Sequence, residues 1–173
     1  MLFRSVCTSA NSSAATITVN AVTVGGTVAG STTVCASNNS GTLTLSGHTG
    51  TIVRWESSLN GGTTWTNIAN TTTSQSFTNL TQSTTYRALV KSGVCDSAYS
   101  SSALVTVNPV SVSGTISSSA TVCYGNNAGT LTLNGSTGAV VRWESSVNGG
   151  TTWTTINNTT TTLAYTNITA TTM

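Results

Sequence analysis

The chain has 173 residues and a formal net charge of +2, and only 5% of its residues are charged, against about a quarter in typical soluble domains. Its Lys and Arg residues are scattered, which excludes the clustered cations that nucleic acid or anionic lipid would need. No apolar run reaches the ~18 residues that cross a bilayer, so we expect no membrane insertion.

Ser and Thr together supply more than a third of the residues, a composition that taken alone would suggest disorder. However, 37% of the residues are hydrophobic, and Val, Ile, Leu, Trp and Tyr recur in short alternating runs. Thr is a good strand former and a poor helix former. Because no apolar pattern with a 3.6-residue period is long enough for a helix, the sequence predicts an all-β chain.

A repeat of 88 residues organises the chain. Residues 26–85 align without a gap to residues 114–173, and well over half of the aligned positions are identical. Similarity of this kind indicates tandem duplication of one structural unit. We therefore expect tandem modules of a single fold.

The repeat predicts three segments. Residues 1–20 match the C-terminal strands of a preceding module, since "ATITVN" at 15–20 parallels "ALVTVN" at 103–108. Residues 21–108 form a complete module, and residues 109–173 form an incomplete module without its last strands. Such a segment belongs to a long repeat protein and is a candidate repeating unit of a filament; a fragment with arbitrary ends is the alternative.

Within residues 21–108 the strand signals are short and are separated by clusters of Gly, Asn and Ser. In chain order they cover 22–28, 42–45, 52–57, 63–68, 76–80, 84–92 and 102–107. Seven short strands in one module are typical of an immunoglobulin-like β-sandwich.

Alternation along these strands predicts which side chains face the core. The inward set is Leu43, Leu45, Val53, Trp55, Tyr86, Ala88, Val90, Val105 and Val107. Trp55, and its counterpart Trp143 in the next module, are the expected core anchors, because a buried Trp on the third strand is typical of this architecture.

Arg54, Glu56, Arg87 and Lys91 should point outward. We expect a cross-strand charge pair of Arg54 and Glu56 with Arg87, worth well under about 1 kcal/mol. A catalytic role for Glu56 is disfavoured, because a glutamate on an open sheet face has no partner acid and nothing to raise its pKa. The sequence thus predicts no enzyme and no cofactor.

The positions of the cysteines predict a disulfide between Cys35, just before one strand, and Cys95, in the hairpin between the last two strands. Closing this loop would stabilise the module by about 4 kcal/mol and suits an oxidising, extracellular setting. Cys7 and Cys123 would then pair with modules outside the chain or with neighbouring copies. We expect no metal site, because zinc-type spacing is absent and the lone His48 becomes Ser136 in the next module.

The most distinctive block is "RWESSLNGGTTW" at 54–65, which returns as "RWESSVNGGTTW" at 142–153. Its inner part resembles the Asp-box hairpin of sialidases, although Asn60 replaces the usual Asp. Asn-Gly-Gly suits a tight hairpin, and a propeller would need copies at closer spacing. Two interpretations of Trp65 and Trp153 stay open: they pack within the hairpin, or they are exposed aromatic side chains that stack on sugars.

This block, with "TTYRALVKSGVC" at 84–95 and "ALVTV" at 103–107, resembles the immunoglobulin-like repeats of giant surface proteins of the Bacteroidota. Those proteins are gliding-motility-type adhesins and related cargo of the type IX secretion system. The resemblance implies export to the cell surface and a stalk or filament role. Asp96-Ser97-Ala98 also fits the O-glycosylation pattern of that phylum, which makes Ser97 a candidate site.

Two functions remain open at this point. The first is a structural repeat of an extracellular adhesin or filament, in which each module is a rigid bead and neighbouring copies or modules are the partners. The second is an array of carbohydrate-binding modules that contacts surface glycans through Trp65 and Trp153.

Overall fold

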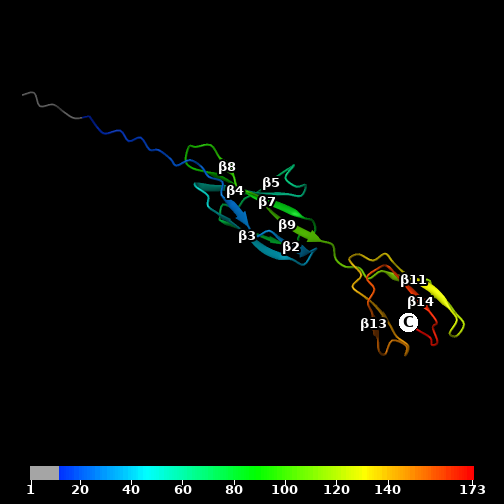
Figure 1. The fold of residues 1–173 in the computed structure, drawn as a ribbon. Coiled ribbons are helices and arrows are strands. Elements are labelled where there is room, and N and C mark those ends of the chain that lie inside the picture. Colours follow the sequence, from blue (N-terminus) through cyan, green and yellow to red (C-terminus); the bar gives the residue numbers. More distant parts are fainter. Residues whose placement is uncertain (1–11) are drawn as a thin grey trace, which may run out of the picture.

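The computed structural model describes residues 12–173, in which every regular element is a β-strand. Figure 1 shows two bodies in succession, which we call the central module (residues 21–108) and the C-terminal module (residues 109–173). Residues 12–20 run outward from the central module, on the side away from the C-terminal module. The predicted all-β class is confirmed.

The central module consists of two sheets. The smaller sheet has the order β1-β3-β6, and all of its pairs are antiparallel. The larger sheet has the order β2-β9-β7-β4-β5, with β8 paired to β7, and β2 runs parallel to β9. The strands are β1 (Thr27–Ala29), β2 (Thr32–Cys35), β3 (Ser40–Ser46), β4 (Thr51–Ser58), β5 (Thr66–Ile68), β6 (Ser74–Thr78), β7 (Thr84–Lys91), β8 (Ala98–Tyr99) and β9 (Ala103–Asn108).

The core of the central module draws on strands of both sheets, as in a β-sandwich. Its largest fully buried side chains are Trp55, Leu43, Val90 and Val105. The Trp55 indole Nε1 donates a 2.9 Å hydrogen bond to the carbonyl oxygen of Thr72, so its polar atom is satisfied inside the protein. Trp143 repeats this contact with Thr160 at the same distance.

Gly41 shows why a glycine interrupts the alternating run of β3. It pairs directly with Phe77 of β6, and a Cβ at Gly41 would overlap the aromatic ring. The ring therefore lies over the glycine backbone and remains 5% exposed. Gly129 and Tyr165 repeat the arrangement 88 residues later.

The expected inward position of Val53 is wrong. The pairing of β4 with β7 shifts between Ile52 and Arg54, which marks a β-bulge. A bulge adds one residue to one strand and so changes the alternation. As a result, Ile52 is 7% exposed and faces the core, whereas Val53 is 42% exposed.

The C-terminal module repeats the pairings of the smaller sheet, with β10 (Thr115–Ser117), β11 (Ala128–Asn134) and β14 (Thr162–Thr166) in the order β10-β11-β14. Of the larger sheet it holds only β12 (Trp143–Ser145) and β13 (Thr154–Ile156). Residues 109–173 contain only the first two positions that correspond to β7, Thr172 and Met173, and none that correspond to β8 and β9. Accordingly, β12 has 3 residues where β4 has 8.

Candidate functional site

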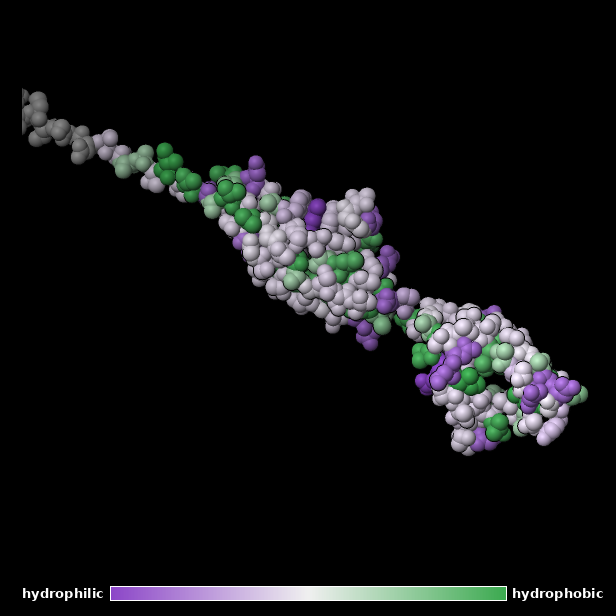
Figure 2. Space-filling view, viewed as in Figure 1, coloured by the Kyte–Doolittle hydropathy of each residue, from purple (hydrophilic) through white to green (hydrophobic). Residues whose placement is uncertain are grey.

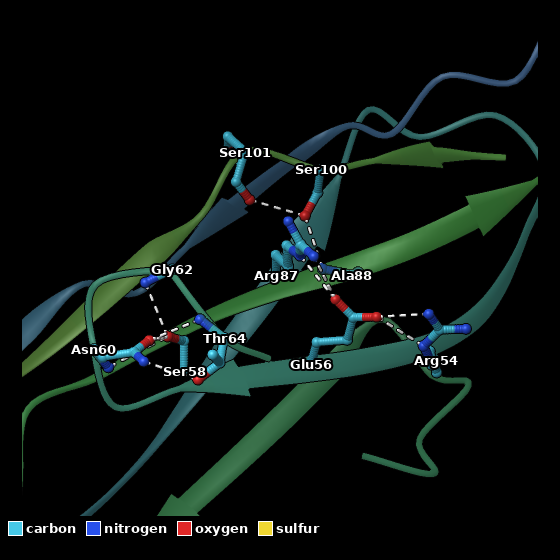
Figure 3. Close-up of polar contacts among 10 residues, drawn as sticks. All are labelled: Arg54, Glu56, Ser58, Asn60, Gly62, Thr64, Arg87, Ala88, Ser100 and Ser101. Carbon is cyan, nitrogen blue, oxygen red and sulfur yellow. Dashed lines mark hydrogen bonds and ion pairs between the residues drawn. The ribbon is translucent and has the colours of Figure 1, made fainter. Parts of the chain in front are cut away.

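The repeated hairpin is held by its own side chains. Ser58 Oγ accepts a 2.8 Å hydrogen bond from the Gly62 amide, and Asn60 Oδ1 accepts one of 2.9 Å from the Thr64 amide. The Ser58 hydroxyl donates to Asn60 Oδ1 at 2.9 Å, so the two side chains orient each other (Figure 3). Gly61 and Gly62 have positive φ angles, which glycine adopts without strain.

The second copy of the hairpin forms the same contacts. Ser146 Oγ accepts from the Gly150 amide at 2.8 Å, and Asn148 Oδ1 accepts from the Thr152 amide at 2.9 Å. In this copy only Thr172 and Met173 correspond to β7, and Met173 exchanges two backbone hydrogen bonds with Ser146, as expected from the pairing of Thr85 with Ser58. The side-chain bonds that hold the hairpin join residues at most four positions apart in both modules.

Glu56 lies between two guanidinium groups on the outer face of the larger sheet. Its Oε1 contacts Arg54 Nη2 at 2.7 Å and its Oε2 contacts Arg87 Nη2 at 2.8 Å (Figure 3). Arg54 neighbours Glu56 on β4, whereas Arg87 is its directly opposite partner on β7. The predicted charge cluster is thus present.

The expected exposure of this cluster is wrong. Glu56 is 2% exposed, so its carboxylate is buried beneath the side chains around it. Burial raises the pKa of Glu56, but hydrogen bonds and attraction from Arg87 and Arg54 outweigh burial and hold that pKa below 4.5. Breaking a buried ion pair costs several times more than the value expected for a surface pair.

Arg87 is itself enclosed by two aromatic rings. Its guanidinium carbon lies 3.8 Å from the centroid of the Trp65 ring and 3.7 Å from that of the Tyr99 ring. Stacking of this kind is favourable because the planar cation lies over the negative face of each ring. Trp65 comes from the end of the hairpin and Tyr99 from β8, so the cation joins three parts of the chain.

Trp65 is consequently half-buried, and one face of its ring is covered by Arg87. Its counterpart Trp153 is 51% exposed, because residues 109–173 hold no counterpart of Arg87 or Tyr99. The counterpart of Glu56 is likewise more exposed than Glu56. Glu144 pairs with Arg142 at 2.8 Å, and the side chains of Glu144 and Arg142 are 40% and 52% exposed.

Tyr99 is the member of this cluster that the sequence does not predict. It lies on a strand of two residues, too short to show alternation, and its pairing with Leu89 depends on the β7–β8 hairpin. No local signal in the sequence indicates its role.

The arrangement offers little for catalysis. Both oxygens of Glu56 are already bonded to arginine, and its lowered pKa keeps it from donating a proton near neutral pH. Within residues 12–173 no three His, Cys, Asp or Glu side chains gather in a group that could hold a metal ion. No helix of the described chain is long and apolar enough to cross a membrane.

The expected disulfide between Cys35 and Cys95 is wrong. Cys35, Cys95 and Cys123 are all free thiols. Cys35 pairs with Asn108 at the end of β9, next to the C-terminal module. Cys95 lies in the hairpin after β7, with its sulfur 3.5 Å from the carbonyl oxygen of Ala21, where the chain enters the central module. Because β7 and β9 are antiparallel, the two thiols lie at opposite ends of the module. Cys7 lies outside the described residues.

Ser97 lies in the exposed hairpin between β7 and β8, next to the exposed Asp96. Neither side chain is covered by another part of the described chain. The hairpin is therefore accessible to a modifying enzyme.

Comparison with known proteins adds a family. Residues 24–109 and residues 112–173 each match the family described as a domain of unknown function, DUF8696. The two matches coincide with the central and C-terminal modules. No curated protein shows significant similarity to the chain.

Proposed function

We propose that this chain, which belongs to the DUF8696 family, is a structural segment of an extracellular adhesin or filament and acts as a stalk without catalytic activity. The observation that carries the proposal is that the distinctive residues of the repeated motif serve the module's own fold. Ser58 and Asn60 hold the hairpin, Glu56 holds two arginines, and Trp65 covers Arg87.

The strand order supports this role. The sheets β1-β3-β6 and β2-β9-β7-β4-β5 are consistent with a β-sandwich, an architecture common among cell-surface domains, and the proposal takes this module as an immunoglobulin-like bead. Only residues 109–111 separate β9 from Val112, whose amide bonds Thr137 of the C-terminal module. A connection this short, with Pro109 in it, restricts the angle between successive modules.

The parallel pair β2–β9 suits a load-bearing module. Tension enters the module on the side of Ala21 and leaves it after Asn108, at the end of β9. When two parallel strands are pulled in opposite directions along their length, the force acts on all of their hydrogen bonds at once. When a hairpin is pulled at its open end, its hydrogen bonds break one after another. The four residue pairs from Thr32–Val105 to Cys35–Asn108 therefore oppose extension together.

Single-molecule force measurement on the chain held at its two ends tests the proposal. A proline at Thr33 in β2 should lower the force that unfolds the central module, because it disrupts the β2–β9 pair. A proline at Thr66 in β5 is the matched control, since β5 lies at the other edge of the sheet. If the two variants lower the force equally, or if the unmodified module offers no resistance, the load-bearing role is wrong.

Export by the type IX system of the Bacteroidota and display at the cell surface are part of the same proposal, and the resemblance of the repeats supports them. Protease accessibility on intact cells of the source organism would test the location.

The alternative of a carbohydrate-binding array is weakened by the half-buried state of Trp65 and the guanidinium over its ring. A glycan platform needs an open ring face. Glycan binding that is lost in Trp65→Ala while the fold persists would reverse this preference.

A further inference from the structure

Three asparagines of the chain are followed directly by glycine, and the structure holds their side chains in two different ways. The pairs are Asn60-Gly61 and Asn148-Gly149, in the two hairpins, and Asn134-Gly135, at the end of β11. An asparagine before glycine is the most prone to lose its side-chain amide. The glycine has no Cβ to hinder its own backbone nitrogen when that nitrogen attacks the neighbouring carboxamide.

Exposure and backbone conformation do not distinguish the three pairs. All three asparagines and all three glycines are exposed. The φ angles of Gly61, Gly135 and Gly149 are 67°, 67° and 66°, and a Cβ at any of them would meet nothing within 4 Å. The three pairs therefore differ only in the hydrogen bonds that their asparagine side chains form.

In the hairpins, both ends of the carboxamide are fixed. Asn60 Oδ1 accepts 2.9 Å hydrogen bonds from the Thr64 amide and the Ser58 hydroxyl, and Asn60 Nδ2 donates one of 2.8 Å to Thr64 Oγ1 (Figure 3). Asn148 forms the same three bonds, each of 2.9 Å, with Thr152 and Ser146. Attack on the carboxamide carbon makes that carbon tetrahedral, which moves its oxygen and nitrogen away from these partners. The hairpin bonds therefore oppose the reaction.

Asn134 is held at one end only. Its Nδ2 donates to Ser117 Oγ at 2.9 Å and, more distantly, to the Thr132 carbonyl oxygen at 3.4 Å. No donor within residues 12–173 reaches its Oδ1. The open position of this turn belongs to the repeat, since Ser46-Gly47 takes the same place in the central module, is exposed, and has a Gly47 φ of 66°.

We propose that Asn134 is a site of spontaneous deamidation, and that the Ser-x-Asn-Gly-Gly-x-Thr bonds protect Asn60 and Asn148 from the same reaction. The Gly135 nitrogen loses its proton and forms a bond to Asn134 Cγ. The bond from Cγ to Nδ2 then breaks, and the nitrogen takes up a proton and leaves as ammonia. Water opens the resulting succinimide at either carbonyl carbon and gives Asp or isoAsp. Water is the only co-reactant, and nothing is oxidised or reduced.

The product places a charge where this sheet has none. Strands β10, β11 and β14 contain no Lys, Arg, Asp or Glu. Figure 2 shows that most of the visible surface of both modules has intermediate hydropathy, as expected for Ser and Thr. Asn134 pairs with Thr115 at the end of the sheet. An isoAsp there lengthens the main chain by one carbon and therefore disturbs this pair.

Peptide mapping by mass spectrometry tests the proposal on the full chain, incubated in mildly alkaline buffer made with water enriched in heavy oxygen. In the folded chain, Asn134 should lose its amide at least about tenfold faster than Asn60 and Asn148, because the hairpins must open locally before they react. In urea the three rates should converge, since each asparagine precedes a glycine. Equal rates in the folded chain would overturn the proposal. So would faster loss at the hairpins, or an unchanged order of rates in urea.

Single substitutions test the protection directly. Ser58→Ala should speed the loss at Asn60 by about 5–30-fold. Asn148 of the same molecule is the matched control and should keep its rate, which also reports that the rest of the chain is folded. Ser146→Ala should give the converse result. Asn134→Gln should abolish the fast phase, because glutamine would have to close a larger ring. An unchanged rate at Asn60 in Ser58→Ala would show that the side-chain bonds do not protect it.

Discussion

Arg87 joins Trp65 to Glu56: its guanidinium carbon lies 3.8 Å from the Trp65 ring while its Nη2 lies 2.8 Å from Glu56 Oε2. Both partners belong to the block "RWESSLNGGTTW", and Arg87 belongs to the neighbouring strand β7. The block is therefore tied to the rest of the sheet by one cation. This contact accounts for both ends of the motif, whereas the hairpin bonds account for its middle.

Substitution of Arg87 by Ala should destabilise the central module by roughly 2–4 kcal/mol, because it leaves a buried carboxylate with Arg54 as its remaining partner. Arg87→Lys keeps the positive charge but loses the planar stack on the rings. Its unfolding free energy should therefore lie between those of the unmodified chain and of Arg87→Ala. Urea unfolding, monitored through hydrogen exchange of the β7 amides, would measure the change in unfolding free energy. The control Lys91→Ala, at an exposed position, should shift stability by less than about 0.5 kcal/mol. An equal effect of both alanine variants would contradict the role of the cluster.

Acid should weaken the central module through Glu56. The pKa of Glu56 is lower in the folded chain than the ordinary value of 4.5, so the folded state binds its proton more weakly than the unfolded state does. The stabilisation is fully present above about pH 4.5 and is lost as the pH falls through the folded pKa. Urea midpoints measured between neutral pH and pH 3 should show the loss, and Glu56→Gln should flatten it. An unchanged slope in Glu56→Gln would assign the acid sensitivity to another group.

Ser58→Ala should destabilise the hairpin by about 1–2 kcal/mol. The buried Ser58 hydroxyl accepts a hydrogen bond from the Gly62 amide and donates one that orients the Asn60 side chain. Hydrogen exchange at the Gly62 and Thr64 amides would report it directly. The matched variant Ser146→Ala should speed exchange in the second hairpin by a similar factor, since its bonds have the same lengths. A much larger effect in one module would mean that the larger sheet, and not the local bonds, holds the hairpin.

Cys35→Ser should leave the unfolding free energy of the isolated chain within about 0.5 kcal/mol of the unmodified value, because Cys35 is an exposed free thiol. A disulfide to Cys95 would instead make the loss about 4 kcal/mol under non-reducing conditions. Thiol titration of the folded chain gives a second readout, with Cys35 reacting before denaturant is added.

The sequence by itself determined the features that depend on near neighbours. The Asn60-Gly61-Gly62 turn and its Ser58 and Thr64 bonds join residues at most four positions apart, and they form alike in both copies of the hairpin. Alternation placed Leu43, Leu45 and Trp55 in the core, because a pleated strand sends successive side chains to opposite faces.

Tertiary structure decided what depends on pairing between distant strands. The parallel β2–β9 pair sends Cys35 to the opposite end from Cys95, and short strands such as β2 carry no signal of their partner. The β-bulge that places Ile52 in the core and leaves Val53 exposed arises from the register of β4 on β7. Burial of Glu56 likewise requires Arg87, Trp65 and Tyr99 to meet above it, which no local pattern encodes. Local hydrogen bonds are set by the spacing of residues in the sequence. The burial of a side chain, and the end of the module at which a residue lies, are set only when distant strands pair.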